Sequence, residues 1–237
     1  MGQPVTLYTI PFAGGGAGQY LTWSAQLPAW VRVVPARLPG RERRIAEPAL
    51  TSIEANADHL ANHDRAEFSS APLAIFGQSM GALVAHELAR RLPRIAALLV
   101  ASSPPPDAPG REAPLHRLPG ALLMAALRRM GGPAPSEELF ALMEPTIRAD
   151  LAACETYQPS FGAPLNCPVV AFAGADDPLA APERMLDWRK MTTGPFTLHV
   201  VAGGHFHPQE SRATFLARLG EALRPLHRPP PAERALG

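Results

Sequence analysis

Cysteine is scarce in this sequence, and the two cysteines do not form a pattern. Cys154 and Cys167 lie outside any CxxC spacing in a chain of 237 residues, so they are too few for a disulfide framework. The chain runs from Met1 directly into a strand-like segment, without the charged and apolar regions of a signal peptide. We therefore expect a cytoplasmic protein.

Strong net charge and long apolar runs are missing as well. The 22 basic and 21 acidic residues leave a formal net charge of +1, so no bulk field favours nucleic acid or an anionic membrane. The apolar run Ile95–Ala101 is far shorter than the roughly 20 residues that a membrane-spanning helix needs. We therefore expect neither nucleic acid nor a membrane as a partner, and we expect a monomer.

Apolar residues are abundant, and they recur with the periods of strands and helices. Hydrophobic residues make up 46% of the chain, which suits one large domain over residues 1–227, followed by a flexible tail at 228–237. Short β-rich runs alternate with helical patterns, as in a mostly parallel sheet flanked by helices. The expected strands are Val5–Ile10, Val31–Pro35, Leu73–Phe76, Ala97–Ala101, Val169–Ala173 and Thr197–Val201. The expected crossover helices are Thr51–His63, Ala82–Leu92 and Ser211–Leu223.

The stretch from Pro104 to Pro164 interrupts this alternation. A proline-rich segment leads into helix-like segments at Pro119–Met130, Glu137–Met143 and Glu144–Tyr157. A long insertion after a sheet strand is tolerated and often functional. The sequence therefore predicts an inserted helical lid at about residues 104–164, with extra scaffold as the alternative.

A serine between two glycines carries the strongest chemical signal. Gly77-Gln-Ser-Met-Gly81 has the form G-x-S-x-G and lies between the expected strand ending at Phe76 and the helix from Ala82. In that context the motif indicates a nucleophile elbow, a sharp turn that exposes the serine at the carboxyl edge of the sheet. Small residues at positions 77 and 81 let the backbone turn. Ser79 is therefore the predicted nucleophile.

A serine hydroxyl needs a base to take its proton. His205 follows Gly203 and Gly204, which come just after the expected strand Thr197–Val201. Two glycines allow the tight turn that would present the His205 ring toward Ser79. His207 lies two residues further on, toward a helix start, and we expect it to face solvent.

An acid must hold the correct tautomer of that histidine and stabilise the imidazolium. Asp177 follows Gly174 by three residues, after the expected strand Val169–Ala173, and gives the chain order Ser, Asp, His of this class of enzyme. Asp177 is the preferred acid. Asp176, which is adjacent, and Asp107, which follows the preceding strand, remain alternatives.

A glycine-rich loop, Pro11–Gly18, follows the first expected strand. An oxyanion hole in this setting uses the backbone N–H after the nucleophile, that of Met80, and a second N–H from this loop. Ala13 is the predicted second donor, and Gly14 is the alternative. A phosphate-binding loop does not fit, because the segment lacks both the Walker lysine and the GxGxxG spacing.

Five segments form a recognisable set: Pro11–Gly15, Arg37–Arg44, Gly77–Gly81, Ala149–Tyr157 and Gly203–Phe206. Together they resemble the motifs of type II thioesterases, the stand-alone editing enzymes of polyketide and nonribosomal peptide synthesis in the α/β-hydrolase superfamily. The resemblance runs through most of the chain. It implies an α/β-hydrolase fold with a helical lid, and it places Ser79, Asp177 and His205 at the family's triad positions. Gln78 departs from the pattern, since histidine is frequent there.

The resemblance also implies a reaction and a partner. The enzyme would hydrolyse acyl groups from the phosphopantetheine arm of acyl or peptidyl carrier proteins and so remove stalled or wrong chains. A thiol with a pKa of about 8.5 leaves readily as thiolate, which suits such a site. No metal or organic cofactor is expected, because the chemistry needs none and Cys and His do not cluster at zinc-ligand spacing. The alternatives are a chain-terminating acyl-ACP or acyl-CoA thioesterase, a small-ester hydrolase with the same triad, and a non-catalytic binding protein.

Two further sets of residues have two interpretations each. Basic side chains are candidates for docking an acidic carrier protein, or else form solvated faces: Arg37, Arg41, Arg43, Arg44, Arg128 and Arg129. Apolar lid residues are candidates for lining an acyl chamber, or else form core: Leu122, Leu123, Leu127, Phe140 and Met143.

Overall fold

Six parallel strands form the centre of the molecule, in the order β2-β1-β3-β4-β5-β6. The computed structural model describes residues 3–68, 72–108, 114–132, 135–160 and 162–227. The strands are β1 (Val5–Ile10), β2 (Val31–Pro35), β3 (Leu73–Gln78), β4 (Ala97–Ala101), β5 (Val169–Gly174) and β6 (Phe196–Val201). The predicted mostly parallel sheet is confirmed, and each strand lies within two residues of its predicted bounds.

Helices connect these strands. The α-helices are α1 (Gly18–Leu21), α2 (Ile53–His63), α3 (Arg65–Phe68), α4 (Met80–Arg91), α5 (Gly120–Arg129), α6 (Glu137–Thr156), α7 (Pro182–Met185), α8 (His207–Glu210) and α9 (Arg212–Leu223). Short 3-10 helices are η1 (Thr22–Ala25), η2 (Glu42–Arg44), η3 (Leu115–Arg117), η4 (Leu186–Met191) and η5 (Arg224–Leu226). The three predicted crossover helices correspond to α2, α4 and α9.

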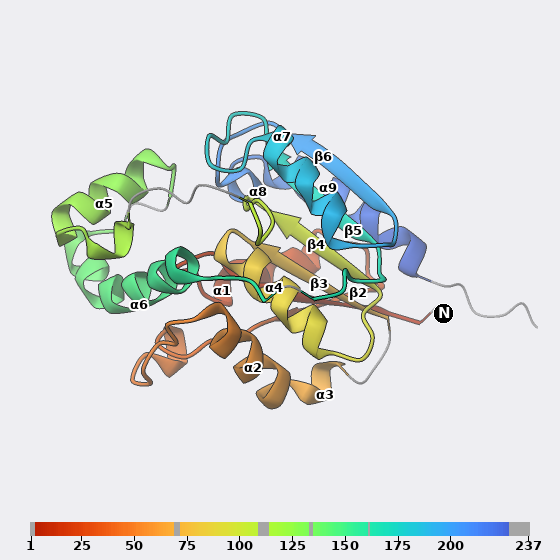
Figure 1. Cartoon of the computed structure of the whole chain (residues 1–237), viewed down its shortest axis with the longest axis horizontal. Helices are drawn as coiled ribbons and strands as arrows, with labels where there is room; N and C mark the ends of the chain where they lie inside the picture. Colours follow the sequence, from red (N-terminus) through yellow and green to blue (C-terminus); the bar gives the residue numbers. More distant parts are fainter. Residues whose placement is uncertain (1–2, 69–71, 109–113, 133–134, 161, 228–237) are drawn as a thin grey trace, which may run out of the picture.

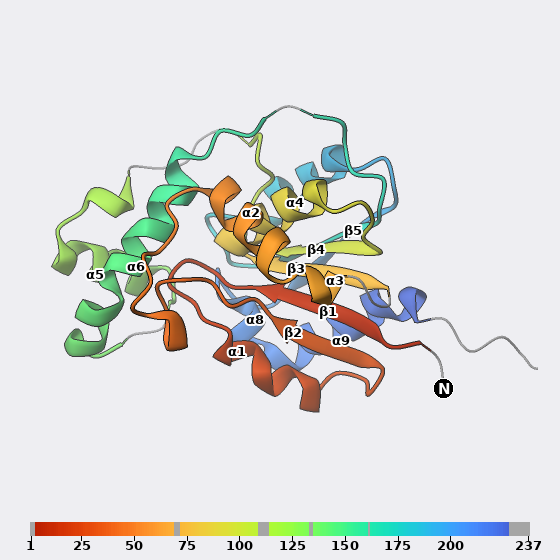
Figure 2. The same ribbon diagram turned by 90° about the horizontal axis from the view of Figure 1, so that it is seen from below.

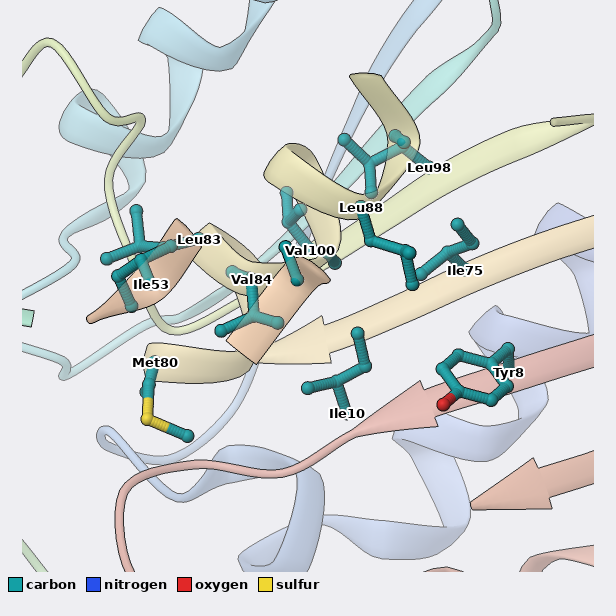
Figure 3. Packing of buried hydrophobic residues seen from close by; sticks show 14 of the residues in the cluster. Tyr8, Ile10, Ile53, Ile75, Met80, Leu83, Val84, Leu88, Leu98 and Val100 are labelled. Carbon is teal, nitrogen blue, oxygen red and sulfur yellow. The ribbon is translucent and has the colours of Figure 1, made fainter. Parts of the chain in front are cut away.

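The two faces of the sheet bury two separate cores. Alternate side chains of a strand point to opposite faces, so Ile75 packs with α2 and α4 on one face while Phe76 packs with α1, η1 and α9 on the other. Figure 2 shows these helices on the two sides of the sheet. Figure 3 shows the first core, in which the side chain of Leu88 from α4 lies beside Ile75 of β3. Helix α4 is therefore held by packing against the sheet.

The connection between β4 and β5 contains η3, α5 and α6. Figure 1 shows α5 and α6 set off to one side of the sheet, the side toward which the strands point. Apolar contacts hold these two helices together, with Leu123 of α5 buried against Phe140, Ile147 and Leu151 of α6. The positions 140, 147 and 151 share one face of a helix, so this cluster lies along one side of α6.

One prediction about this insertion is wrong. The segments Glu137–Met143 and Glu144–Tyr157 form a single helix of 20 residues that passes through Pro145. Proline in a helix interior removes a backbone hydrogen bond and costs about 3 kcal/mol. Phe140 precedes Pro145 in the helix, and Ile147 and Leu151 follow it. All three are buried against Leu123 of α5, and this burial offsets the cost of the proline.

Two further predictions concern the chain's ends and its environment. The predicted tail at residues 228–237 lies outside the described residues. Among the helices that the structure describes, none combines the length and the apolar character required to cross a bilayer. The cytoplasmic location stays a prediction from the sequence.

Candidate active site

Ser79 occupies a strained turn between β3 and α4. Its backbone has φ 53° and ψ −116°, a conformation that non-glycine residues rarely adopt and that tends to occur at functional sites. The flanking glycines allow the turn, because a Cβ at Gly77 would lie 2.0 Å from the carbonyl oxygen of Gly81 and one at Gly81 would lie 2.2 Å from that of Ile10. The predicted elbow geometry is therefore present.

The histidine and the preferred acid lie beside this serine. The Nε2 atom of His205 lies 3.0 Å from Ser79 Oγ, and its Nδ1 atom lies 3.0 Å from Asp177 Oδ2. Asp177 follows β5 and His205 follows β6, so both reach the carboxyl edge of the sheet where Ser79 lies. The structure thus brings the three predicted residues into one hydrogen-bonded chain.

Electrostatics around Asp177 favour its ionised form. Burial alone would raise its pKa, but the hydrogen bond and charge of His205, together with the backbone N–H groups of Leu179 and Ala180, outweigh burial and lower the pKa. A carboxylate here accepts the Nδ1 proton of His205, which leaves Nε2 free to accept the serine proton. The alternative acids Asp107 and Asp176 are exposed at the surface.

His207 does not face solvent, and that prediction is wrong. Its side chain is fully buried, with Nδ1 lying 3.2 Å from the carbonyl oxygen of Gly204. Helix α8 turns the chain inward directly after His205, which packs the His207 ring at 5.9 Å from the Phe215 ring. Burial lowers the pKa of His207 to about 4, so this imidazole is neutral at physiological pH.

The glycine-rich loop after β1 forms a tight turn. The N–H of Gly15 donates to the carbonyl of Phe12 at 2.8 Å, and Gly14 has φ 76°, as a type II turn requires. The Gly14 N–H donates to Asp150 Oδ2 at 2.7 Å, so it is engaged elsewhere than in an oxyanion hole. Met80 is the first residue of α4, and an N–H in a first turn has no acceptor within its helix. Ala13 and Met80 remain the predicted donors.

Two of the cavities against the inserted helices border the predicted site. The first, of about 590 Å³, is lined by Ser79, Met80 and His205, and by Ala126 and Cys154 from α5 and α6. The second, of about 460 Å³, is largely apolar and lies against Ala13; its lining includes Leu127, Phe140, Met143 and Phe206.

Three of the candidate chamber residues therefore do line a cavity: Leu127, Phe140 and Met143. The two others do not, since Leu123 is fully buried in the helix-to-helix core and Leu122 is 56% exposed.

One charged pair next to the loop was not predicted from the sequence. Arg41, a candidate docking residue, is instead buried and forms a two-point ion pair with the fully buried Asp150 of α6, 109 residues away. The two residues lie in two of the five family-like segments, and that was the available signal. Their pairing was not visible because nothing local links them.

A second missed feature is an amide pair behind the elbow. Gln78 is buried and exchanges two hydrogen bonds with Gln209 of α8, at 3.0 and 2.8 Å. This pair ties the elbow to the segment that carries His205. No group of three or more His, Cys, Asp or Glu side chains in the described ranges is placed to hold a metal ion.

Known proteins resemble this chain in both sequence and structure. The thioesterase domain family matches residues 5–223. The chain is 38% identical to thioesterase PikA5 of Streptomyces venezuelae over 213 residues, covering 86% of this chain and 75% of that protein. The type II thioesterase BorB, from the borrelidin biosynthetic cluster, aligns with a TM-score of 0.87 at 38% identity over 93% of each chain. RedJ, a thioesterase from the prodiginine pathway of Streptomyces coelicolor, aligns with a TM-score of 0.83 at 37% identity, covering 92% of this chain and 85% of that chain.

These similarities extend over the sheet, the elbow and the inserted helices alike, and the fold they share is that of the α/β-hydrolases. The chain therefore belongs to the thioesterase domain family, and within it to the type II thioesterases that accompany polyketide and nonribosomal peptide pathways.

Proposed function

We propose that this thioesterase removes acyl groups from the phosphopantetheine arm of acyl or peptidyl carrier proteins, with Ser79, His205 and Asp177 as its catalytic residues. The observation that supports this most directly is the hydrogen-bonded chain from Ser79 through His205 to Asp177, which opens into a cleft beneath α5 and α6. The similar proteins BorB and YbtT are type II thioesterases of biosynthetic pathways, the second of them an NRPS/PKS pathway, and this supports a carrier protein as the partner of this chain.

The reaction has two halves. Ser79 Oγ attacks the thioester carbonyl while His205 Nε2 takes the hydroxyl proton, and the C–S bond then breaks to release the pantetheine thiol and leave an acyl-serine. His205 gives its proton to the leaving thiolate. In the second half His205 takes a proton from water as the water oxygen attacks the acyl-serine carbonyl, and it returns this proton to Ser79 Oγ as the ester C–O bond breaks and the free acid leaves. The N–H groups of Ala13 and Met80 stabilise the oxyanion in both halves; such a donor contributes about 10²- to 10³-fold in rate.

We further propose that residues 1–227 act as one catalytic domain, and that the insertion at about 104–164 is its lid. The lining of both cavities supports this, since α5 and α6 contribute to each of them. Among the candidate docking arginines, Arg129 is exposed and lines the same cleft as Ser79, whereas Arg41 is buried. The arginines of α5 are therefore better placed to meet a carrier protein that delivers its arm to the serine.

The test compares matched substrates on the native enzyme and on Ser79→Ala. The native enzyme should show a higher kcat/KM for an acyl-carrier protein than for acyl-CoA with the same acyl chain, because the carrier adds binding surface. Ser79→Ala should lose several orders of magnitude in turnover and all labelling by a fluorophosphonate, with little change in stability. Equal efficiency on the two carriers would favour a small-ester or acyl-CoA hydrolase, and full activity of Ser79→Ala would exclude the serine mechanism.

A further inference from the structure

The carboxylate of Asp150 is the meeting point of the lid helix α6 and the loop after β1. Its Oδ2 atom accepts the Gly14 N–H at 2.7 Å and Arg41 Nη1 at 2.8 Å, and its Oδ1 atom accepts Arg41 Nη2 at 2.9 Å. Arg41 Nη1 also donates to the carbonyl of Gly15 at 3.1 Å. The buried Arg41–Asp150 ion pair thus forms hydrogen bonds with two successive residues of the glycine turn, Gly14 and Gly15.

Shape reinforces these polar contacts. A Cβ at Gly14 would lie 2.6 Å from Ile147 Cγ1, so the turn lies directly against α6. Thr146 Oγ1 donates to the carbonyl of Gly40, the residue before Arg41. Thr146, Ile147 and Asp150 are spaced to share one face of the helix, and this face docks both loops.

A buried ion pair is weak evidence for a role in stability, because desolvation of the two charges consumes much of their attraction. The Arg41–Asp150 pair differs from a simple ion pair, because it also forms hydrogen bonds with the backbone of Gly14 and Gly15. The hydrogen bond from the Gly15 N–H to the Phe12 carbonyl closes the turn, and the hydrogen bond from the Gly14 N–H to Asp150 holds its central peptide. The direction of the neighbouring Ala13 N–H is set with them.

We infer that Asp150 is a positioning residue of the oxyanion hole: by holding the Gly14 N–H it aims the Ala13 N–H at the reacting carbonyl, and Arg41 holds Asp150 in place. This inference rests on the proposed function, because it needs the serine mechanism. It makes the oxyanion hole depend on α6, since any movement that lifts residues 146–150 away withdraws the acceptor from Gly14. The hole is complete only while this part of the lid helix is docked.

The first experiment measures Asp150→Asn and Asp150→Ala on one acyl thioester. An interaction that acts on the transition state lowers kcat and leaves KM nearly unchanged. We expect kcat to fall about 10- to 100-fold, less than for outright loss of a donor, with KM within about twofold of the native value. Affinity for an alkyl boronic acid, which forms a tetrahedral adduct with the serine, should fall by the same factor as kcat.

A double variant that restores activity would show that Asp150 acts by positioning the Gly14 N–H and not through its charge. In the double variant Arg41→Gln with Asp150→Asn, the amide carbonyl introduced at position 150 can accept the Gly14 N–H, and no charge is left unpaired; a reciprocal amide pair of this kind already exists between Gln78 and Gln209. This variant should recover most of the lost kcat. Arg41→Lys, which keeps the charge but loses the two-point geometry, should show a smaller loss than Asp150→Ala.

The matched control is Glu87→Gln. Glu87 is a buried carboxylate on α4 that pairs with Arg91 and accepts from Tyr157, away from the glycine turn. This variant should lower the melting temperature while kcat, counted per site titrated with a fluorophosphonate, stays at the native value. If the Asp150 variants behave like this control, with native kcat per titrated site and native boronic acid affinity, the inference is wrong. In that case, loss of activity in Ser79→Ala would still support the proposed function. A failure of the inference is therefore distinguishable from a failure of the proposed function.

Discussion

Asp177 differs from the neighbouring acids in its surroundings and not in its chemistry. It is buried, it accepts two backbone N–H groups, and it faces His205, whereas Asp176 and Asp107 are exposed. Loss of the acid's charge in a triad of this kind lowers kcat by about 10⁴-fold, because the histidine then takes the wrong tautomer.

We therefore predict that Asp177→Asn reduces turnover of an acyl thioester by about three to four orders of magnitude. Asp176→Asn and Asp107→Asn serve as matched controls and should retain most of the activity. Steady-state kcat/KM for the three variants checks this. A severe loss in Asp107→Asn with an active Asp177→Asn would move the acid to the end of β4.

The buried His207 should make the fold sensitive to acid. Its folded pKa of about 4 lies below its ordinary value of 6.5, so between these values the unfolded chain binds more protons and the free energy of unfolding falls as pH falls. This loss approaches about 3 kcal/mol below pH 4 for one such group. His86, whose pKa burial also lowers to about 4, adds to it.

Urea denaturation at about pH 7 and about pH 4.5 checks this prediction, because the two values lie on either side of most of the titration. The difference in unfolding free energy between the two conditions should be smaller in His207→Gln than in the native protein, because one of the two titrations is removed. Parallel pH dependence in the two proteins would mean that the pKa of His207 is not lowered in the folded state.

The residues of the triad were predictable because each follows a strand and carries its own local signal. Ser79 lies between two glycines after β3, and His205 follows two glycines after β6. The pairs Arg41 with Asp150 and Gln78 with Gln209 depend on segments 109 and 131 residues apart. The sequence shows each of these side chains but not the distance between them.

At the scale of elements, a buried parallel strand is a continuous apolar run, and such runs are short and well bounded. This is why the four central strands β1, β3, β4 and β5, which are fully buried, were predicted within two residues. The edge strands β2 and β6 are only partly buried, and their β-branched residues indicated them instead. Helix α6 was predicted as two pieces because proline is a local signal for a break, while the packing of α6 against α5 that keeps the helix continuous is tertiary.

The lining of the second cavity leads to a prediction about the effect of α5 on acyl chain length. Leu127 lines this cavity, whereas Leu122 on the same helix is 56% exposed. Leu127→Trp should lower kcat/KM for a long acyl chain about tenfold or more and have a smaller effect on a short chain, because the added volume narrows the chamber. Leu122→Trp is the matched control and should change neither. Hydrolysis rates across a series of chain lengths give the readout; equal losses at every length would show that acyl chains do not enter this cavity.

At the scale of the whole molecule, the alternation of strands and helices determined the architecture, because parallel neighbours require crossover connections that cover both faces of the sheet. The placement of α5 and α6 over the carboxyl edge followed from their position after β4. How closely they dock there did not follow, since it depends on the contacts of Ile147 and Asp150 with the glycine turn.

The order of the strands also bears on how the enzyme fails on heating. The edge strand β6 is only partly buried, in contrast to the fully buried β3 and β5, and the segment that carries His205 follows directly from it. Exposed edges open locally at a lower free energy than a central strand does. Such an opening would withdraw His205 from Ser79 while the remaining strands stay paired.

We expect thermal inactivation to occur several degrees below the loss of far-ultraviolet circular dichroism, with amide hydrogens of Phe196–Val201 exchanging faster than those of Leu73–Gln78. Coincident loss of activity and helicity would instead mean that the edge and the centre of the sheet unfold as one cooperative unit.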